Sequence, residues 1–261
     1  MQTHLLPPDL SPVMQKLSVA NREFTQRYPG ILSRRQPVHT LYGGAHLYKN
    51  GASGKLGNLA LRHFEIYASN SVEMATALGI ETLDDSGEQK EILSRVFDRV
   101  IAKLQREPIE DQRIDFEDGY GLRSDEEEDS HAVSAAVAVH AGMQSEDLPP
   151  FIGIRVKALT EEGRERSIRT LDIFLSTLTA LTDGKLPDPF YVTLPKVTHP
   201  VQVEVLASCL DTLEERCGLE SGQIQIELMI ETIQSIFKPT GECGIPDLVS
   251  AGSGRVSSAI L

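Results

Sequence analysis

Charged side chains stand directly after several short apolar runs of this sequence. In chain order they are Asp115, Glu117, Asp118, Arg155, Lys157, Lys196 and Glu231. If the apolar runs are parallel strands, these side chains meet at one edge of a sheet, because sites in parallel β/α folds lie at the carboxyl ends of the strands. A rim of carboxylates facing two or three cations suits a hard metal ion and an anionic substrate.

Two of these side chains stand out because they adjoin strongly apolar sequence. Arg155 lies inside GIRVKAL, where an unpaired guanidinium would be costly, so we expect it to meet a carboxylate or a ligand anion. Glu231 follows LMI and faces the same cost. A lone carboxylate after a strand is more often a helix cap or a loop residue, and we interpret the acidic run 125–129 as a solvated first helical turn.

Several common catalytic and nucleotide-binding motifs are missing. The segment GASGKL lacks the first glycine and the final serine or threonine of a phosphate loop, and YGGAH and GSGR lack the dinucleotide-binding spacing. The chain also has no G-x-S-x-G elbow and no H-E-x-x-H helix. We therefore expect neither an NTPase nor a dinucleotide-dependent enzyme.

The elements that would carry these residues alternate between strands and helices. Short apolar runs predict strands within 37–43, 113–118, 150–156, 189–196, 223–231 and 255–261. Apolar residues at every fourth position predict a helix at 88–106, and further helices are expected at about 55–69, 71–79, 168–181 and 200–218. Ser124 with Glu127 forms a capping box for a further helix, which we expect to end at Gly142.

This alternation indicates repeated βαβ units and a parallel sheet, with strands that are apolar on both faces. We predict an α/β fold, a TIM-type (β/α)8 barrel of which about six strands are present. A doubly wound open sheet would give the same pattern. The expected organisation is an N-terminal arm over 1–34, irregular or with a short helix, followed by the barrel over 35–261.

Composition limits the partners that we expect. The 261 residues carry 38 acidic and 25 basic side chains, a formal net charge of −13 with neutral histidines, which disfavours nucleic acid and anionic membranes. The three cysteines form no C-x-x-C pair, and neither a signal peptide nor a membrane span is evident. We therefore expect a cytoplasmic protein.

The ordered set of strand ends resembles a known superfamily. The segments IDFEDGYG, GIRVKAL, YVTLPKV and IELMIET are similar to those of the citrate lyase beta-subunit-like branch of the HpcH/HpaI aldolases. With PVHTLYGGAHLYK included, the chain more closely resembles an uncharacterised aldolase-like branch of that superfamily, over about 35–261. The resemblance implies a TIM-type barrel, Mg²⁺, a small 2-oxo acid substrate and a homo-oligomer.

The resemblance also implies roles for individual residues. Glu231 matches the first metal ligand, and Arg155 matches the arginine that grips the substrate carboxylate. Glu117 and Asp118 match acidic residues close to the metal. Lys196 matches a supporting position at the barrel mouth. Gly43, Gly44 and His46 are expected near the substrate because they follow the first strand.

The sequence departs from the superfamily pattern in two places. The second metal ligand, an aspartate after the sixth strand, would fall beyond Leu261, so we expect an incomplete, C-terminally truncated barrel. The first glycine-rich loop differs from that of the lyases that handle coenzyme A thioesters, which argues against a coenzyme A thioester as substrate. The leading hypothesis is an Mg²⁺-dependent carbon–carbon lyase acting on a 2-oxo acid or its enolate. The alternatives are a phosphoenolpyruvate- or pyruvate-type transferase, and a catalytically dead fragment or regulatory module that keeps only the anion pocket.

Overall fold

The computed structural model describes residues 7–30, 35–80 and 87–261. These residues form two compact units, 1–37 and 38–261. The first unit contains helix α1, Pro7–Arg27, whose 21 residues make it longer than the short helix that the sequence predicts. Its apolar side chains are largely exposed, including Val13, Leu17 and Phe24. Parts of the predicted arm, 1–6 and 31–34, lie outside the described residues.

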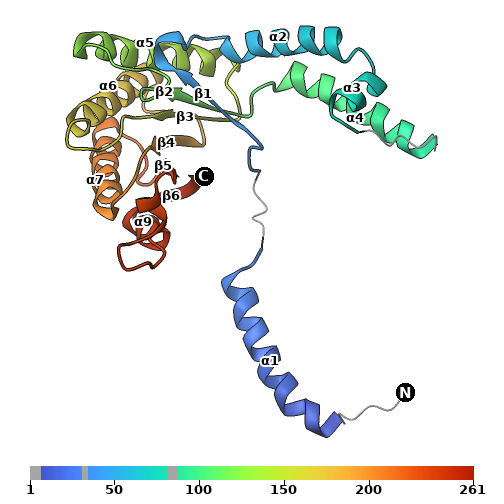
Figure 1. Ribbon diagram of the computed structural model, residues 1–261. Helices are drawn as coiled ribbons and strands as arrows, with labels where there is room; N and C mark the ends of the chain where they lie inside the picture. The colour runs from blue at the N-terminus through green and yellow to red at the C-terminus, as the bar shows by residue number, and fades with distance from the viewer. Residues whose placement is uncertain (1–6, 31–34, 81–86) are drawn as a thin grey trace. The chain divides into compact units, whose positions relative to one another are not determined.

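The second unit is built on a six-stranded parallel sheet (Figure 1). Its strands are β1 Thr40–Gly44, β2 Asp111–Asp115, β3 Phe151–Arg155, β4 Phe190–Leu194, β5 Ile224–Met229 and β6 Val256–Ile260. Its helices are α2 Ala52–Tyr67, α3 Ser71–Ala77, α4 Gly87–Arg106, α5 Asp125–Ser145, α6 Arg164–Thr182, α7 Pro200–Cys217, α8 Ile233–Ile236 and α9 Ile245–Ala251, with a 3-10 turn η1 at Ala45–Leu47.

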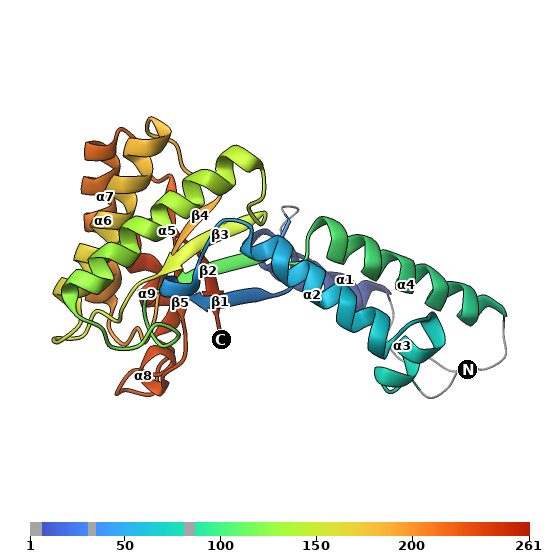
Figure 2. The same ribbon diagram turned by 90° about the horizontal axis from the view of Figure 1, so that it is seen from above.

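The strand order decides between the two folds that the sequence allows. The strands lie in the order β1-β2-β3-β4-β5-β6, so each connection moves one place in the same direction. A doubly wound sheet would reverse direction at a switch point. Figure 2 shows α5, α6 and α7 together on one side of the sheet, as in a barrel wall. The fold is α/β and consistent with part of a TIM-type barrel, and the sheet of the described residues is not closed.

Only one face of the sheet is apolar, so the expectation of strands with two apolar faces is wrong. Ile114, Ile154 and Val192 point toward the helices and are fully buried in the core. The alternate positions on the other face carry polar or charged side chains, as at Arg113 and Glu227. Successive side chains of a strand alternate between faces, so this polar face is the side that a barrel would enclose.

Local sequence explains where the helices of the wall begin. Ser124 accepts a hydrogen bond from the Glu127 backbone N–H at 3.2 Å, and Glu127 accepts one from Ser124, which confirms the predicted capping box. The helix runs three residues past Gly142, however, and ends at a left-handed Glu146, so its predicted end is wrong. The fit of Gly142 against Leu148 explains the glycine, because an added Cβ would lie 2.5 Å from that side chain.

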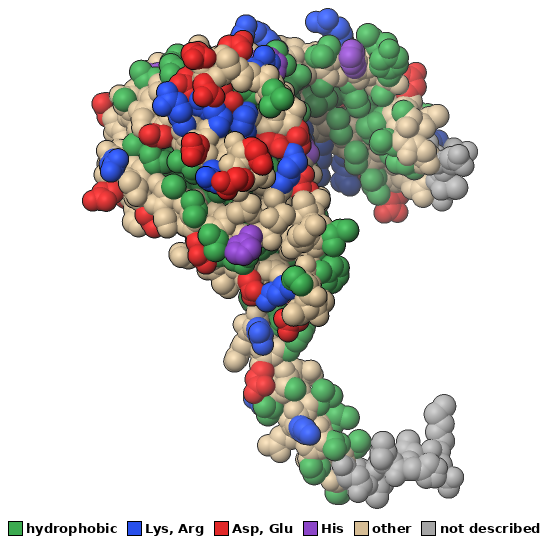
Figure 3. Space-filling view, turned by 60° about the vertical axis from the view of Figure 1, so that its left-hand side comes forward, with side chains coloured by type: hydrophobic (Ala, Val, Ile, Leu, Met, Phe, Trp, Pro, Cys, Tyr) green, Lys and Arg blue, Asp and Glu red, His purple; other side chains and the backbone are tan. Residues whose placement is uncertain are grey.

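Helices α2, α3 and α4 connect β1 to β2 in the sequence and pack together beside the sheet (Figure 2). They pack on one another, for example through Phe64 and Phe97, whose ring centroids are 5.2 Å apart. The predicted apolar face of α4 stays partly exposed, with Ile92 and Val96 more than two-fifths accessible. Hydrophobic side chains gather on this layer in Figure 3, while over the helical wall lysines and arginines lie among acidic side chains. None of the described helices is long and apolar enough to cross a membrane.

Candidate active site

One register row across the six strands carries most of the polar inner face. Pairing of adjacent strands aligns Gly44, Asp115, Arg155, Thr193, Glu227 and Ser258. In-register parallel pairing brings the side chains of this row together on the inner face. The row therefore joins residues that lie up to about two hundred positions apart in the sequence.

Arg155 finds the carboxylate partner that its apolar surroundings require. Its Nε and Nη2 donate to the two oxygens of Asp115 at 2.7 and 2.5 Å, a bidentate pair. Its guanidinium carbon lies 4.7 Å from the centre of the Tyr42 ring. Burial alone would lower the pKa of Arg155, but the hydrogen bonds and charge of Asp115 outweigh it, and the pKa is raised.

The bidentate pair with Asp115 occupies one edge of the Arg155 guanidinium and leaves a second edge for another acceptor. A guanidinium carries five N–H donors, and the Nε–Nη2 edge is occupied by Asp115. The Nη1 group faces Glu117 at 3.7 Å and the Met229 sulfur at 3.5 Å. The end-on edge, Nη1 with the second hydrogen of Nη2, can therefore meet a second carboxylate.

Asp115 also organises the turn after β2. Its oxygens accept hydrogen bonds from the backbone N–H groups of Glu117 at 2.9 Å and Gly119 at 2.7 Å. Position 119 has no room for a side chain, because a Cβ added at Gly119 would lie 2.5 Å from the Asp115 carboxylate. One fully buried side chain thus positions both Arg155 and the loop that carries Glu117 and Asp118.

Lys196 contacts three further predicted rim residues, Glu117, Asp118 and Glu231. Its ammonium pairs with Glu117 and, at 2.7 Å, with Asp118. Its backbone N–H donates to Glu231 Oε1 at 2.7 Å. The pKa of Asp118 is lowered, chiefly because Lys196 donates a hydrogen bond to it. The structure therefore brings Arg155 and these four residues to the carboxyl ends of β2 to β5.

Beneath this rim, the structure reveals a buried ionic network that the sequence analysis missed. Arg113 is 1% exposed and donates from Nε and Nη2 to Glu227 at 3.0 and 2.8 Å. It also pairs with Asp111 and lies 4.8 Å from the centre of the Tyr191 ring. The side chain extends from β2 past β3, where Gly153 provides no side chain in its path.

The carboxylate of Glu227 is satisfied from several strands. Besides Arg113, it accepts hydrogen bonds from Thr193 at 2.7 Å and Ser258 at 2.9 Å. The Tyr42 hydroxyl lies 3.4 Å from it, and burial followed by the Glu227 charge raises the pKa of that hydroxyl. A polar residue at every second position of DQRID was the signal for this network, since an inward-facing strand side has that period.

Of the predicted substrate residues of the first strand, Gly44 lies beside Asp115 in the register row, whereas His46 lies among the rings of Tyr120 and His131. Gly44 is where two backbones approach, because an added Cβ would lie 2.3 Å from the Gly119 carbonyl oxygen. Next to it, Gly43 pairs with Ile114 of β2. The ring of His46 lies 5.6 Å from that of Tyr120 and 6.2 Å from that of His131. Its pKa is lowered, first by burial and then by the charges of Arg123 and His131.

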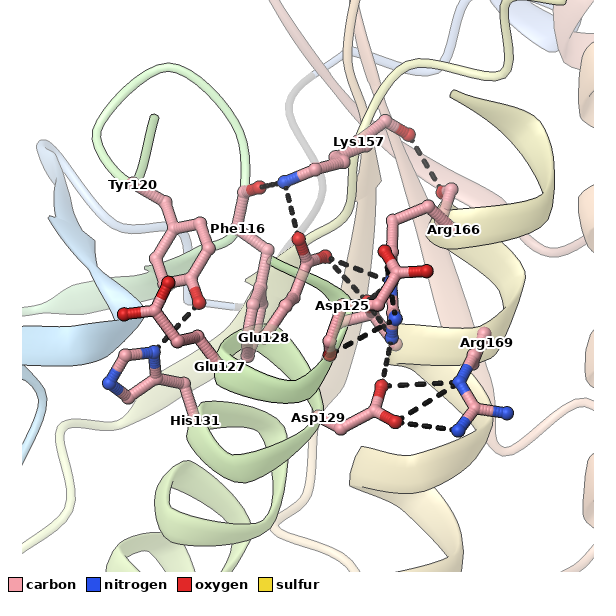
Figure 4. Close-up of polar contacts among 12 residues, drawn as sticks. Phe116, Tyr120, Asp125, Glu127, Glu128, Asp129, His131, Lys157, Arg166 and Arg169 are labelled. Carbon is pink, nitrogen blue, oxygen red and sulfur yellow. Dashed lines mark hydrogen bonds and ion pairs between the residues drawn. The ribbon is translucent and has the colours of Figure 1, made fainter. Parts of the chain in front are cut away.

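A second charged cluster connects the β3 end to the helical wall (Figure 4). Lys157 donates to the Phe116 carbonyl at 2.7 Å and pairs with Glu128 at 2.8 Å. Glu128 also accepts from Thr170 at 2.6 Å and is only 1% exposed. The acidic run at the start of α5 is therefore not a wholly solvated turn, because Glu128 is buried and paired. Nearby, Tyr120 donates to or accepts from His131 at 2.7 Å.

One cavity lies beside the rim and a larger one lies in the helical wall. One of about 520 Å³ includes Glu117, Asp118 and Lys157 in its lining, and places them next to the α5 and α6 starts. A larger one of about 760 Å³ lies between α6 and α7 and contains none of the predicted site residues. Among the residues that the structure describes, no group of three or more histidine, cysteine, aspartate or glutamate side chains is arranged to hold a metal ion.

The fold and the charged rim define a parallel β/α protein with its polar groups at the carboxyl edge of the sheet. The family model described as a domain of unknown function (DUF6986) matches residues 17–261, and the chain belongs to this family. No curated protein matches the chain. A solved citrate lyase structure from Burkholderia xenovorans LB400 is similar at 20% identity with a TM-score of 0.41. That match covers 61% of this chain and 48% of the citrate lyase chain, so the chain spans about half of its length.

Proposed function

We propose that this chain is an aldolase-like carbon–carbon lyase that acts on a 2-oxo acid or its enolate, related to the HpcH/HpaI and citrate lyase beta-like enzymes that its strand ends resemble. The observation that carries the proposal is the assembly of Arg155, Glu117, Asp118, Lys196 and Glu231 at one edge of the sheet. Arg155 is buried, Glu117 and Lys196 are half-buried, and Asp118 and Glu231 are exposed. Charges of both signs at the carboxyl ends of strands support a site for a small anion.

Arg155 would bind the substrate carboxylate through the end-on edge of its guanidinium. Asp115 holds the other edge at 2.7 and 2.5 Å, so the arginine is already oriented before a ligand arrives. Pre-orientation lowers the entropic cost of binding and of reaction. The Tyr42 ring under the guanidinium limits its movement in the remaining direction.

Cleavage of a carbon–carbon bond beside a carbonyl develops negative charge on the carbonyl oxygen, and the site must stabilise it. The carboxylates here have the donor type that Mg²⁺ prefers, and Mg²⁺ commonly uses only one or two of them together with water and substrate. Glu231 would hold the ion, with Glu117 or Asp118 acting through water. When bound, Mg²⁺ would polarise the substrate carbonyl as a Lewis acid. The ion, the 2-oxo acid and a homo-oligomeric state all remain predictions.

Ligand-induced stabilisation tests the proposal. Pyruvate or oxaloacetate with Mg²⁺ should raise the melting temperature of the wild-type chain, by about 5 °C or more at a hundredfold excess over Kd. Arg155→Lys should lose this shift, because a point charge cannot replace the fork that serves two carboxylates. Arg169→Lys is the matched control, since Arg169 pairs with Asp129 on the exposed surface. A shift that survives in Arg155→Lys would refute the assignment.

A binding module without turnover is the second candidate, and one observation favours it. The described residues hold no ready group of three or more metal-binding side chains. On this reading the chain would bind a 2-oxo acid through Arg155 without cleaving it. Proton NMR of oxaloacetate or of candidate aldol products, incubated with the protein and Mg²⁺, separates the two candidates. Product formation above the Arg155→Lys background would exclude the binding module.

A further inference from the structure

Arg123 is a charged side chain that the proposed function does not use. It lies in the turn between β2 and α5, directly before the Ser124 that caps this helix. Its guanidinium carbon lies 4.7 Å from the centre of the Tyr120 ring, and Tyr120 is only 3% exposed. The cap fixes the backbone next to Arg123 and the buried ring limits the movement of its side chain, so the half-buried cation is held in place.

The Arg123 guanidinium has no acceptor among the residues that the structure describes. Its Nε is buried without a hydrogen-bond partner, and Arg123 forms no ion pair within the described part of the chain. Arg113, Arg155 and Arg255, by contrast, each pair with a carboxylate. A buried donor that lacks an acceptor is costly, and a ligand that supplies the acceptor removes this cost.

Arg123 lines the cavity of about 520 Å³ beside the rim. Two other cations line it, Lys157 and Arg166, and both are already paired, with Glu128 at 2.8 Å and with Asp129 at 2.5 Å (Figure 4). A volume of this size is typical of a pocket for a small ligand. Of these three described cations, only Arg123 therefore has its hydrogen-bond donors available to an occupant of the cavity.

Carboxylates also line the cavity, but most of their charge is compensated. The fifth acidic side chain of the lining, Glu162, is exposed, so water and salt screen it. An additional carboxylate in the cavity would therefore meet the uncompensated charge of Arg123. The four acidic side chains that already have a cationic partner are Glu117, Asp118, Asp125 and Glu128.

Glu117 connects this cavity to the proposed substrate site. It lines the cavity, and its carboxylate also lies 3.7 Å from Nη1 of Arg155. Nη1 belongs to the guanidinium edge that Asp115 leaves available. The cavity therefore begins beside the group that is proposed to bind the substrate carboxylate, and a ligand on Arg155 can extend past Glu117 toward Arg123.

We propose that Arg123 binds a second carboxylate of the substrate, so that the site selects 2-oxo diacids over 2-oxo monoacids. The inference rests on the proposed function, in which Arg155 binds the first carboxylate. Arginine suits this role because its planar fork donates two parallel hydrogen bonds to one carboxylate. The second carboxylate would supply the acceptor that the buried Nε of Arg123 lacks among the described residues.

Calorimetric titration of the full chain at one fixed Mg²⁺ concentration tests this selectivity. Oxaloacetate, 2-oxoglutarate and 2-oxoadipate are each compared with the monoacid of the same length, namely 2-oxobutyrate, 2-oxopentanoate and 2-oxohexanoate. For at least one length, the wild type should bind the diacid about tenfold or more tighter, because hydrogen bonds between charged groups contribute this much.

Arg123→Met removes the charge but keeps an apolar side chain against the Tyr120 ring. It should abolish the preference for the diacid and leave the Kd of pyruvate unchanged. Arg123→Gln reports the same loss if the methionine variant folds poorly. Arg169→Met is the matched control, because Arg169 is 61% exposed, pairs with Asp129 and is not part of the cavity lining. It should keep the preference.

Three results would overturn the inference. The first is equal affinity of the wild type for diacid and monoacid at all three lengths. The second is a preference for the diacid that survives the loss of Arg123, or that is lost equally in Arg169→Met. The third is a loss of pyruvate binding as large as the loss of diacid binding, because Arg123 would then support the whole rim rather than bind the second carboxylate.

The outcome is separable from that of the proposed function. Binding of pyruvate that depends on Arg155, without any preference for a diacid, would support the proposed function and overturn this inference. Binding of a diacid that depends on Arg123 but not on Arg155 would uphold the Arg123 site and refute the assignment of Arg155. If neither pyruvate nor any diacid binds, both are refuted.

Discussion

Replacing Glu227 by glutamine should destabilise the protein strongly although the residue lies below the proposed site. The carboxylate is 2% exposed and accepts two hydrogen bonds from Arg113, at 3.0 and 2.8 Å. It accepts two more from Thr193 and Ser258. Breaking one partner of a buried ion pair costs about 3–5 kcal/mol, because the other charge is left uncompensated.

The lower end of that range applies here, about 3 kcal/mol, since Asp111 still pairs with Arg113 in the variant. In urea, with a slope of about 3 kcal/mol/M for a chain of this size, the midpoint should fall by about 1 M. Far-UV circular dichroism and tyrosine fluorescence should give coincident curves if unfolding is two-state, and the chain has no tryptophan to complicate the emission.

Glu161→Gln provides the comparison. Glu161 is 79% exposed and pairs with Arg164, three residues away, so the same chemical change should cost less than about 0.5 kcal/mol. If Glu227→Gln is no more destabilising than this surface variant, the reasoning is refuted. The Arg113 network would then be either solvated or redundant.

Two further predictions concern packing and pH. Gly153→Ala should destabilise the protein by about 2 kcal/mol or more, because the new Cβ would lie 2.1 Å from the Tyr191 carbonyl oxygen. The control is Gly87→Ala, whose Cβ would have no described atom within 4 Å beyond its own stretch of helix and which should leave stability in urea titrations unchanged or slightly higher. Burial alone would raise the pKa of Glu214, but hydrogen bonds from Arg255 and from two backbone N–H groups lower this pKa overall. The Glu214 carboxylate therefore stabilises the fold at pH values above its ordinary pKa of 4.5, and this contribution is lost as the pH falls through the folded-state pKa. Glu214→Gln should therefore be less stable than wild type at pH 7 and lose less stability on acidification below pH 4.5, and parallel wild-type and variant curves would contradict this.

Local signals predicted the elements, because the forces that they report act within a few residues. The capping box of Ser124 and Glu127 opens α5 as expected. Pro200 begins α7, and Gly218 ends it in the left-handed conformation, with φ +71°. The end of α5 was predicted less well, since Gly142 is there for close packing rather than for termination. A glycine in the sequence does not distinguish these two causes.

The position of the rim residues followed from the strand ends, whereas a particular pairing was predictable only where a single residue implied its own need for a partner. An arginine in the apolar segment of Arg155 has to be paired, and this could be inferred without a structure. Which carboxylate pairs with it depends on strand register, and Asp115 is forty positions away. The pairing of Arg113 was not predicted, because its partners Asp111 and Glu227 are set by the alternation of side chains along β2 and by the strand register.

Burial divides the charges of the inner face into two groups with different roles. Arg113, Asp115 and Glu227 are at most 2% exposed, and their hydrogen bonds are satisfied within the protein. Asp118 and Lys196 are 62% and 38% exposed, in ion pairs that water and ions can reach. A satisfied buried group exchanges its partner at a high energetic cost, whereas an exposed pair exchanges at a low one. Substitutions in the first group should therefore reduce stability before they affect ligand affinity, and substitutions in the second should do the opposite.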